Sequence, residues 1–222
     1  MNAPALKSKC LPTYLVIDTS SSMKSHESLL NDTVDHVFDV VGNSPRVAEF
    51  AHVSIITFNT DAHVVLELSD IETVENLPTI TCQGTTNYGK MFQLVKQRID
   101  ADISGLTHDG RRAVLRPAVF ILTDGEPMDK DWATQFNALT DASWRRRPHI
   151  ISYGFGTANA TVLGKIATKA AYLATDVDKE KEAIVSMLTS LLNTLVASAS
   201  AQEFRIPDDV PGYTRVPIEF VD

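Results

Sequence analysis

Three short clusters of oxygen-bearing side chains could bind a metal ion together. The first is Asp-Thr-Ser-Ser-Ser at 18–22, the second is Gly-Thr-Thr-Asn at 84–87, and the third is Thr-Asp-Gly at 123–125. Carboxylate and hydroxyl oxygens are hard donors, which suit Mg²⁺, Ca²⁺ or Mn²⁺ and suit zinc or copper poorly. The clusters therefore predict a divalent-metal site, provided that the fold brings them to one place.

The elements before these clusters predict that they meet. The apolar run 14–17 predicts a strand that ends at Asp18, and the run 118–122 predicts a central strand that ends at Thr123. Segments of helical period separate the strands, a pattern typical of a parallel sheet covered on both faces. Because the carboxyl ends of parallel strands share one edge, where ligands settle, Asp18, Asp124 and the hydroxyls should converge there.

The alternation along the chain predicts an α/β protein with a Rossmann-like, doubly wound and mostly parallel central sheet. Residues 52–58 and 62–68 are expected to form a hairpin, which would supply one antiparallel edge strand. Helices are expected on both faces of the sheet, and further strands beside the central one. The expected helices lie at 30–41, 91–99, 131–144, 162–168 and 184–195, and the further strands at 149–153 and 171–174.

No internal repeat and no linker divides the sequence, so we expect one domain over residues 11–198. The remaining segment, 199–222, has no helical period and contains Pro207, Pro211 and Pro217. We interpret it as an extended C-terminal tail, which could serve as an interaction arm.

Composition limits the classes of partner. The 222 residues carry a formal net charge of −8, which disfavours nucleic acid as a partner and fits a cation or a basic protein surface. The two cysteines, Cys10 and Cys82, suggest a reducing compartment, although one disulfide is not ruled out. The first ten residues lack the apolar segment of a signal peptide, and no apolar run approaches bilayer length. We therefore expect a cytoplasmic protein without a membrane partner.

The three clusters together resemble the metal ion-dependent adhesion site (MIDAS) of von Willebrand factor A (VWA) domains. The matching residues are Asp18-x-Ser20-x-Ser22, the glycine-preceded Thr86, and Asp124 in its strand-end Thr-Asp-Gly. The stretches 15–20, 84–87 and 120–127 resemble in particular the bacterial TerY-like branch, which is associated with tellurite resistance and stress response. One departure is Ser21, where relatives often carry glycine, and it bears on the geometry of the turn rather than on a ligand.

The resemblance implies which atoms would hold the cation. Ser20, Ser22 and Thr86 would bind through their hydroxyls, Thr86 sometimes through water, while Asp18 and Asp124 would act mainly through bridging waters or hydrogen bonds. We expect Mg²⁺, with Ca²⁺ or Mn²⁺ as alternatives. A cation held mostly by neutral ligands keeps much of its charge, so an acidic side chain of a partner protein can complete its shell.

The resemblance thus implies a non-catalytic, metal-dependent protein-binding module. Its setting would be a cytoplasmic tellurite-resistance or stress-response signalling complex, with a kinase-like or phosphatase-like protein as partner. The alternative is a Mg²⁺-dependent phosphohydrolase of the haloacid dehalogenase type, with Asp18 as nucleophile. That class needs an acid two residues later as proton donor, and Ser20 stands there. A third alternative is a scaffold that has lost its metal and makes contact through its tail.

Each site residue also has a structural interpretation. Ser20 and Ser22 could cap a following helix, and Asp124 could be a turn residue before glycine. Thr85 competes with Thr86 as the ligand. The remaining candidates are expected to be structural: the six histidines share no ligand spacing, Trp132 and Trp144 should pack on a helix, and Asp129 to Asp131 should form a solvated helix start.

Overall fold

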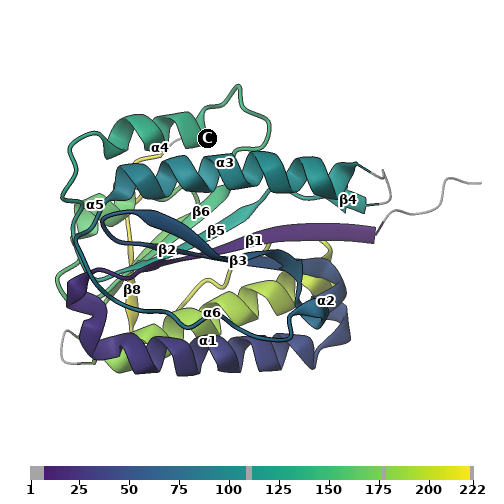
Figure 1. The fold of residues 1–222 in the computed structure, drawn as a ribbon, viewed down its shortest axis with the longest axis horizontal. Coiled ribbons are helices and arrows are strands. Elements are labelled where there is room, and N and C mark those ends of the chain that lie inside the picture. Colours follow the sequence, from purple (N-terminus) through teal and green to yellow (C-terminus); the bar gives the residue numbers. More distant parts are fainter. Residues whose placement is uncertain (1–7, 109–111, 177–178, 221–222) are drawn as a thin grey trace, which may run out of the picture.

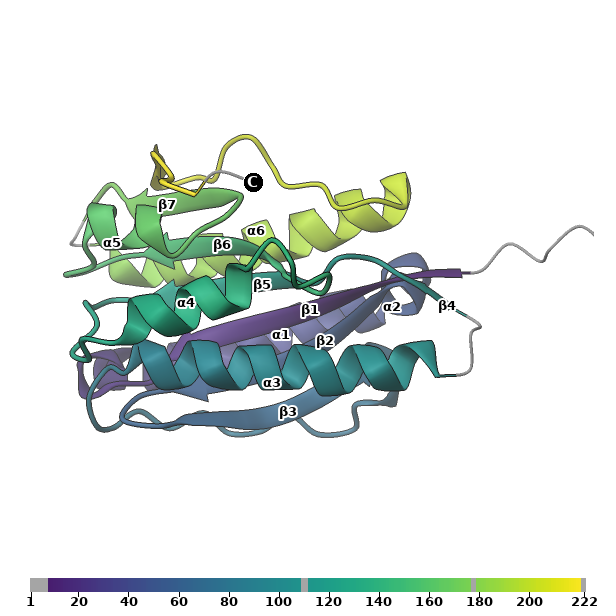
Figure 2. The same cartoon turned by 90° about the horizontal axis from the view of Figure 1, so that it is seen from above.

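The computed structural model describes residues 8–108, 112–176 and 179–220, and its centre is one eight-stranded sheet (Figure 1). The order of the strands is β3-β2-β1-β5-β6-β7-β8, with the short β4 paired to β1 beside β5. Figure 2 shows this order from β3 at one edge to β7 near the other. The strands are β1 (Ser8–Asp18), β2 (Ala51–Phe58), β3 (Ala62–Asp70), β4 (Arg112–Val114), β5 (Ala118–Thr123), β6 (His149–Gly154), β7 (Ala170–Ala174) and β8 (Tyr213–Val216).

The sheet is mostly parallel, as predicted. Strand β1 pairs in parallel with β2, β4 and β5, and β6 pairs in parallel with β5 and β7. The predicted hairpin is confirmed, because β3 pairs antiparallel with β2. The expectation of a single antiparallel edge strand is wrong, since β8 also pairs antiparallel, with β7. Strand β8 has only four residues and lies between Pro211 and Pro217, so its sequence shows no alternation long enough to predict a strand.

Helices cover both faces of the sheet. Figure 1 shows α1 and α6 on one face, and α3 and α4 on the other. The α-helices are α1 (Glu27–Gly42), α2 (Pro45–Phe50), α3 (Tyr88–Thr107), α4 (Trp132–Thr140), α5 (Ala160–Lys165) and α6 (Glu180–Ala201), and the 3-10 helices are η1 (Ser21–His26) and η2 (Ile71–Thr73). The α/β architecture with helices on both faces therefore agrees with the sequence prediction.

The central strands are buried on both faces, which explains their continuous apolar runs. In β1, Leu15 and Ile17 join the core under α1 and α6, whereas Tyr14 and Val16 join the core under α3 and α4. Strand β5 alternates in the same way. This burial fixes the register of the strands. The register in turn determines where each strand ends and where the polar loop after it begins.

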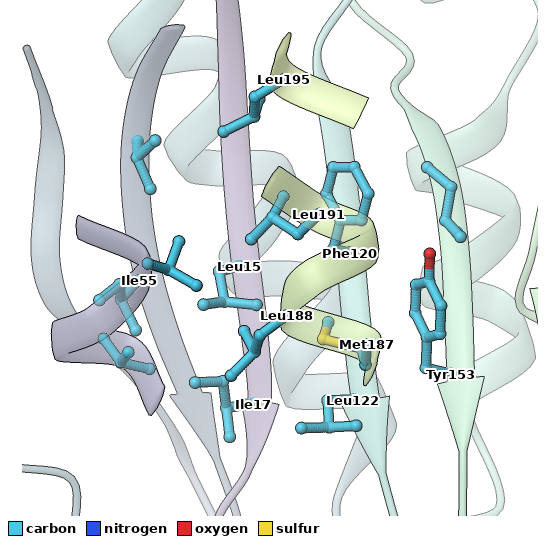
Figure 3. Packing of buried hydrophobic residues seen from close by; sticks show 14 of the residues in the cluster. Leu15, Ile17, Ile55, Phe120, Leu122, Tyr153, Met187, Leu188, Leu191 and Leu195 are labelled. Atoms are coloured by element: carbon cyan, nitrogen blue, oxygen red, sulfur yellow. The ribbon is translucent and has the colours of Figure 1, made fainter. Parts of the chain in front are cut away.

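Helix α6 is a core helix of the sheet. Leu188 and Leu191 point from α6 toward Leu15 and Phe120 in the close view (Figure 3), and all four are at most 1% exposed. The helix is nevertheless long and apolar enough to cross a membrane, which corrects the expectation that no segment approaches this length. More than half of its most apolar stretch is buried inside the molecule, so packing on the sheet accounts for its composition.

The C-terminal segment returns to the domain instead of projecting from it. Helix α6 continues to Ala201, and Tyr213 donates its hydroxyl proton to the backbone carbonyl of Ala183 at 3.0 Å. Val210 is buried, and Ile206 packs against the same core. Among the described residues of 199–222, the predicted extended tail thus includes an edge strand and part of the core.

Other boundaries differ where local signals were weak. Helix α4 ends at Thr140, so Trp144 lies beyond it and not on it as predicted. The short helix α2 was not predicted; it begins at Pro45, because proline suits the first turn of a helix. The short strand β4, which begins at Arg112, was not predicted either.

Candidate functional site

The first loop is anchored by Asp18, the last residue of β1. Its side chain is 0% exposed, and its two carboxylate oxygens have different partners. Oδ1 accepts a hydrogen bond from the backbone N–H of Ser20 at 2.9 Å, and Oδ2 accepts one from the hydroxyl of Thr123 at 2.7 Å. The carboxylate therefore joins the ends of the neighbouring strands β1 and β5.

A chain of side-chain contacts continues across the same two loops. The hydroxyls of Ser20 and Ser22 lie 3.0 Å apart, and Ser22 donates to Oδ1 of Asp124 at 2.9 Å. Ser20 and Asp124 are buried, while Ser22 is exposed. Although Ser20 occupies the position before η1, its side chain makes no capping hydrogen bond, which disfavours the capping interpretation.

The second loop contributes Thr86. This residue is 6% exposed, and within the described ranges its hydroxyl has no hydrogen-bond partner. A Cβ on Gly125 would lie 3.9 Å from its Oγ1, so the hydroxyl is beside the third loop. Thr85, the competing candidate, is exposed, and its hydroxyl lies 3.1 Å from that of Thr60. The structure thus brings Thr86, and not Thr85, to Gly125.

Backbone hydrogen bonds hold the first two loops against each other. Gln83 donates to the carbonyl of Thr19 at 2.7 Å, and Ser21 donates to the carbonyl of Gly84 at 3.0 Å. Gly84 has a φ of +78°, and a Cβ there would lie 2.6 Å from the hydroxyl oxygen of Thr60. Both the conformation and the close approach require glycine at this position.

The five predicted site residues therefore come from three loops at the carboxyl ends of β1 and β5, as expected. Within the described residues, Asp18 and Asp124 form no ion pair with lysine or arginine. Burial raises the pKa of Asp18 to about 6 and also raises the pKa of Asp124. Two buried carboxylates without a basic partner are costly, and a cation would offset this cost.

The donor set is consistent with such a cation. The described ranges contain no group of three or more His, Cys, Asp or Glu side chains that could hold a metal ion. Any cation here would therefore rely on hydroxyl oxygens, and Thr86 offers one that no protein group of the described residues uses. The residues fit a hard cation with oxygen ligands, which is the prediction from the sequence.

Two residues that position the loops of the site were not predicted from the sequence. Tyr88 is fully buried, and its hydroxyl lies 3.2 Å from Thr123 Oγ1 and donates to the carbonyl of Gly125 at 3.0 Å. Asp129, expected to be solvated, accepts from the backbone N–H groups of Tyr88 and Gly89 at 2.8 and 2.9 Å. Asp129 thus fixes the start of α3 next to the site. In the sequence, the only indication of a role for Tyr88 was that it directly follows the Gly-Thr-Thr-Asn cluster.

A contact between a histidine and a glutamate also borders the site. Glu180 Oε2 lies 2.8 Å from Nε2 of the buried His26, and the negative charge of Glu180 contributes to the raised pKa of Asp124. A Cβ on Gly156 would lie 2.9 Å from the other Glu180 oxygen and 3.6 Å from Cβ of Asp124. Glu180 comes from the first turn of α6, far along the sequence, so no motif could have indicated it.

Both tryptophans and His52 contact neighbouring side chains. Trp132 packs on Tyr88 and Phe92, and Lys96 lies 3.5 Å from the ring centre of Trp144. His52 contacts the thiol of Cys10 at 3.3 Å, near the amino end of the parallel strands. These contacts confirm that both tryptophans pack against neighbouring side chains.

A family comparison agrees with this fold. The model of the von Willebrand factor type A domain matches residues 14–189, and the chain belongs to this family. No curated protein matches the chain.

Solved structures show the same fold at low identity. The pilus adhesin SpaC of Lactobacillus rhamnosus GG has a TM-score of 0.64 at 13% identity, covering 86% of this chain and 31% of SpaC. Proximal thread matrix protein 1 of the mussel byssus has a TM-score of 0.58 at 18% identity, covering 86% and 49%. The same mussel protein with a zinc-occupied MIDAS motif has a TM-score of 0.51 at 18% identity, covering 83% and 46%. The chain spans about half or less of the length of these proteins.

Proposed function

We propose that the chain is a metal-dependent protein-binding module without catalytic activity of its own. The metal would be held by Ser20, Ser22 and Thr86, with Asp18 and Asp124 behind them. The observation that carries the proposal is the hydroxyl of the buried residue Thr86, which lies beside Gly125 and has no protein partner in the described ranges, next to the contact chain of Ser20, Ser22 and Asp124. Domains of this family are generally interaction modules rather than enzymes.

The protein groups have separable roles in this proposal. Asp18 already accepts from Ser20 and Thr123, so it orients the loop and supplies negative charge. Asp124 accepts from Ser22 and would keep that hydroxyl directed at the site. A bound divalent cation would supply the positive charge that attracts a carboxylate of the partner. Ser22, the exposed member of the set, lies on the side from which a partner would approach.

The metal proposed first is Mg²⁺, with Ca²⁺ or Mn²⁺ as alternatives, because all the donors are oxygens. Zinc belongs in the same comparison, since the MIDAS motif of the mussel protein was found with zinc. The phosphohydrolase alternative has no support in the site, because the hydroxyl of Ser20 contacts that of Ser22 and no acid stands at position 20.

The cellular setting is proposed from the sequence resemblance. We propose a TerY-like role in a tellurite-resistance or stress-response complex, in the cytoplasm, with a kinase-like or phosphatase-like partner. Cys10 and Cys82 are both free and buried, which suits a reducing compartment. A pull-down from the native host with and without chelator tests this setting, because the partner should be lost when the metal is removed.

The threonine pair offers a matched test of the site. Thr86→Val removes the proposed metal-binding hydroxyl at nearly constant shape, and Thr85→Val does the same one residue away. Melting temperatures would be measured with and without Mg²⁺, Ca²⁺, Mn²⁺ and Zn²⁺. At about 100 times the dissociation constant, a bound ion adds about 2.7 kcal/mol of stability. The wild type and Thr85→Val should gain this stability and Thr86→Val should lose it; equal gains in both variants would contradict the assignment.

Hydrolysis provides the separate test of the enzyme alternative. The purified chain should not hydrolyse p-nitrophenyl phosphate in the presence of Mg²⁺. Activity that disappears in Asp18→Asn would overturn the non-catalytic proposal and favour the phosphohydrolase.

A further inference from the structure

An exposed methionine lies on the rim of the candidate metal site. Met128 is 71% exposed, the highest value among the large apolar side chains of the described residues. Its backbone N–H donates to the carbonyl of Thr86 at 2.9 Å, and the next residue, Asp129, is fixed to the start of α3. The backbone thus holds a flexible, polarizable side chain in water beside Thr86, where it can adapt to an apolar group of a partner.

A polar groove borders the same site. It encloses about 450 Å³, and its lining includes Thr19 and Gly84, which belong to the first two loops of the site. Its wall also offers hydroxyl and amide groups from the turn between β2 and β3 and from the segment before Gly84, among them Asn59, Thr79, Thr81 and Gln83. His63, Val65 and Ile80 complete part of the lining. Its lining includes no lysine or arginine, and the one carboxylate there, on Asp61, is paired with Lys90.

The methionine and the groove lie on different sides of the site. The groove is lined by residues of β2, of β3 and of the turn between them. The loop that carries Met128 instead follows β5. In the sheet, β2 and β3 lie on one side of β1, and β5 lies on the other (Figure 2). A segment that crosses the site would therefore meet an apolar side chain on one side and hydrogen-bonding groups on the other.

We propose that the partner presents an asymmetric motif, an acidic residue with an apolar side chain on one side and small polar side chains on the other. This proposal rests on the metal-dependent binding proposed above. The acidic residue would reach the metal, the apolar side chain would pack on Met128, and the polar residues would exchange hydrogen bonds with the threonines and amides of the groove. The apolar contact with Met128 supplies affinity, and the groove determines the direction in which the partner segment binds.

A displayed library of random peptides with a fixed central glutamate tests this motif. The full chain would be immobilised, loaded with Mg²⁺ or Mn²⁺, and eluted with EDTA so that only metal-dependent peptides are recovered. The expected consensus has an apolar residue at a constant offset on one side of the glutamate and serine, threonine, asparagine or glutamine on the other.

Two pairs of variants then locate each half of the motif. Met128→Gln should weaken the selected peptides about tenfold, as expected for the loss of one apolar contact, whereas Met128→Leu should retain them. Val196→Gln, at an exposed apolar position near the other end of α6, is the matched control. Thr79→Tyr fills the groove and should weaken the same peptides, while Thr189→Tyr on the exposed face of α6 should not.

The outcomes separate this inference from the proposed function. Each variant is first titrated with metal by thermal shift, and all of them should respond as the wild type does. Metal-dependent peptides that lack the asymmetric consensus, or that bind Met128→Gln and Thr79→Tyr unchanged, would overturn the inference and leave the metal-dependent module standing. A wild-type chain that neither responds to metal nor yields chelator-sensitive peptides would overturn both.

Discussion

The hydroxyl of Thr123 donates a hydrogen bond of 2.7 Å to Oδ2 of Asp18, and this contact joins the carboxyl ends of β1 and β5. Both residues are 0% exposed, so water does not replace the bond if it is lost. Tyr88 supports Thr123 from the side of α3, at 3.2 Å. The buried carboxylate of Asp18 therefore fixes the positions of the two loops that carry the first and last parts of the site.

Thr123→Val should lower the free energy of unfolding by about 1–3 kcal/mol, because it leaves a buried carboxylate oxygen without its donor. Urea denaturation of the metal-free protein at neutral pH measures this change. Thr189→Val, at an exposed helical position, should stay within about 0.5 kcal/mol of the wild type. If the two variants have equal stability, the Asp18–Thr123 bond does not hold the strand ends as described.

Asp18→Ala and Asp124→Ala should each abolish the stabilisation by metal while the chain remains folded. Each substitution removes negative charge and an acceptor that orients a hydroxyl of the site. Thermal shift with and without Mg²⁺ measures the loss, and circular dichroism checks the fold. Asp35→Ala, at an exposed position of α1, is the control for a simple change in net charge. Metal responses equal to that of the wild type in both site variants would refute the assignment.

The effect of metal should depend on pH through Asp18. Burial raises its pKa from the ordinary value of 3.8 to about 6 in the metal-free fold. Between these values the folded state binds more protons than the unfolded state, so the contribution of Asp18 to metal-free stability rises as pH falls. A divalent cation requires the ionised form, so its stabilising effect should shrink as pH falls below about 6.

Melting temperatures with and without Mg²⁺ at pH 7.5 and pH 5 test this dependence. The difference between the two conditions should be clearly smaller at pH 5. A difference that is constant over this range would show that protonation of Asp18 does not compete with the metal.

Leu188→Ala should lower the free energy of unfolding by about 2–5 kcal/mol, because Leu188 is 0% exposed and packs between α6 and the sheet (Figure 3). Val196→Ala, at a position of the same helix that is 42% exposed, should change stability by less than about 0.5 kcal/mol. Chemical denaturation of the two variants in aqueous buffer is the measurement. Similar small effects at both positions would contradict the role of α6 as a core helix.

The site loops could be predicted from the sequence because strong local signals surround them. The β-formers before Asp18 and before Thr123 are buried on both faces, so each strand is an uninterrupted apolar run with a clear end. Parallel pairing then places both ends on one edge of the sheet, and this rule does not depend on side-chain detail. The preference for Thr86 over Thr85 rested on the family resemblance, because Thr86 stands two residues after Gly84 as in VWA domains.

The parts that the sequence did not predict depend on contacts between distant segments. Strand β8 exists because β7 offers an open edge, and nothing within the four residues Tyr213–Val216 indicates this. Glu180 reaches the site only because α6 begins beside Gly156. Asp129 was expected to be solvated because its role, accepting from the first N–H groups of α3, becomes visible only when α3 is in place. Tertiary packing decided each of these cases.

A crystal structure of the chain soaked with Mn²⁺, with anomalous diffraction to locate the ion, tests the central claim most directly. The account predicts an anomalous peak at the oxygens of Ser20, Ser22 and Thr86, with Asp18 and Asp124 behind them, and no such peak in Thr86→Val. A peak elsewhere on the molecule, or none in the wild type at saturating Mn²⁺, would contradict it.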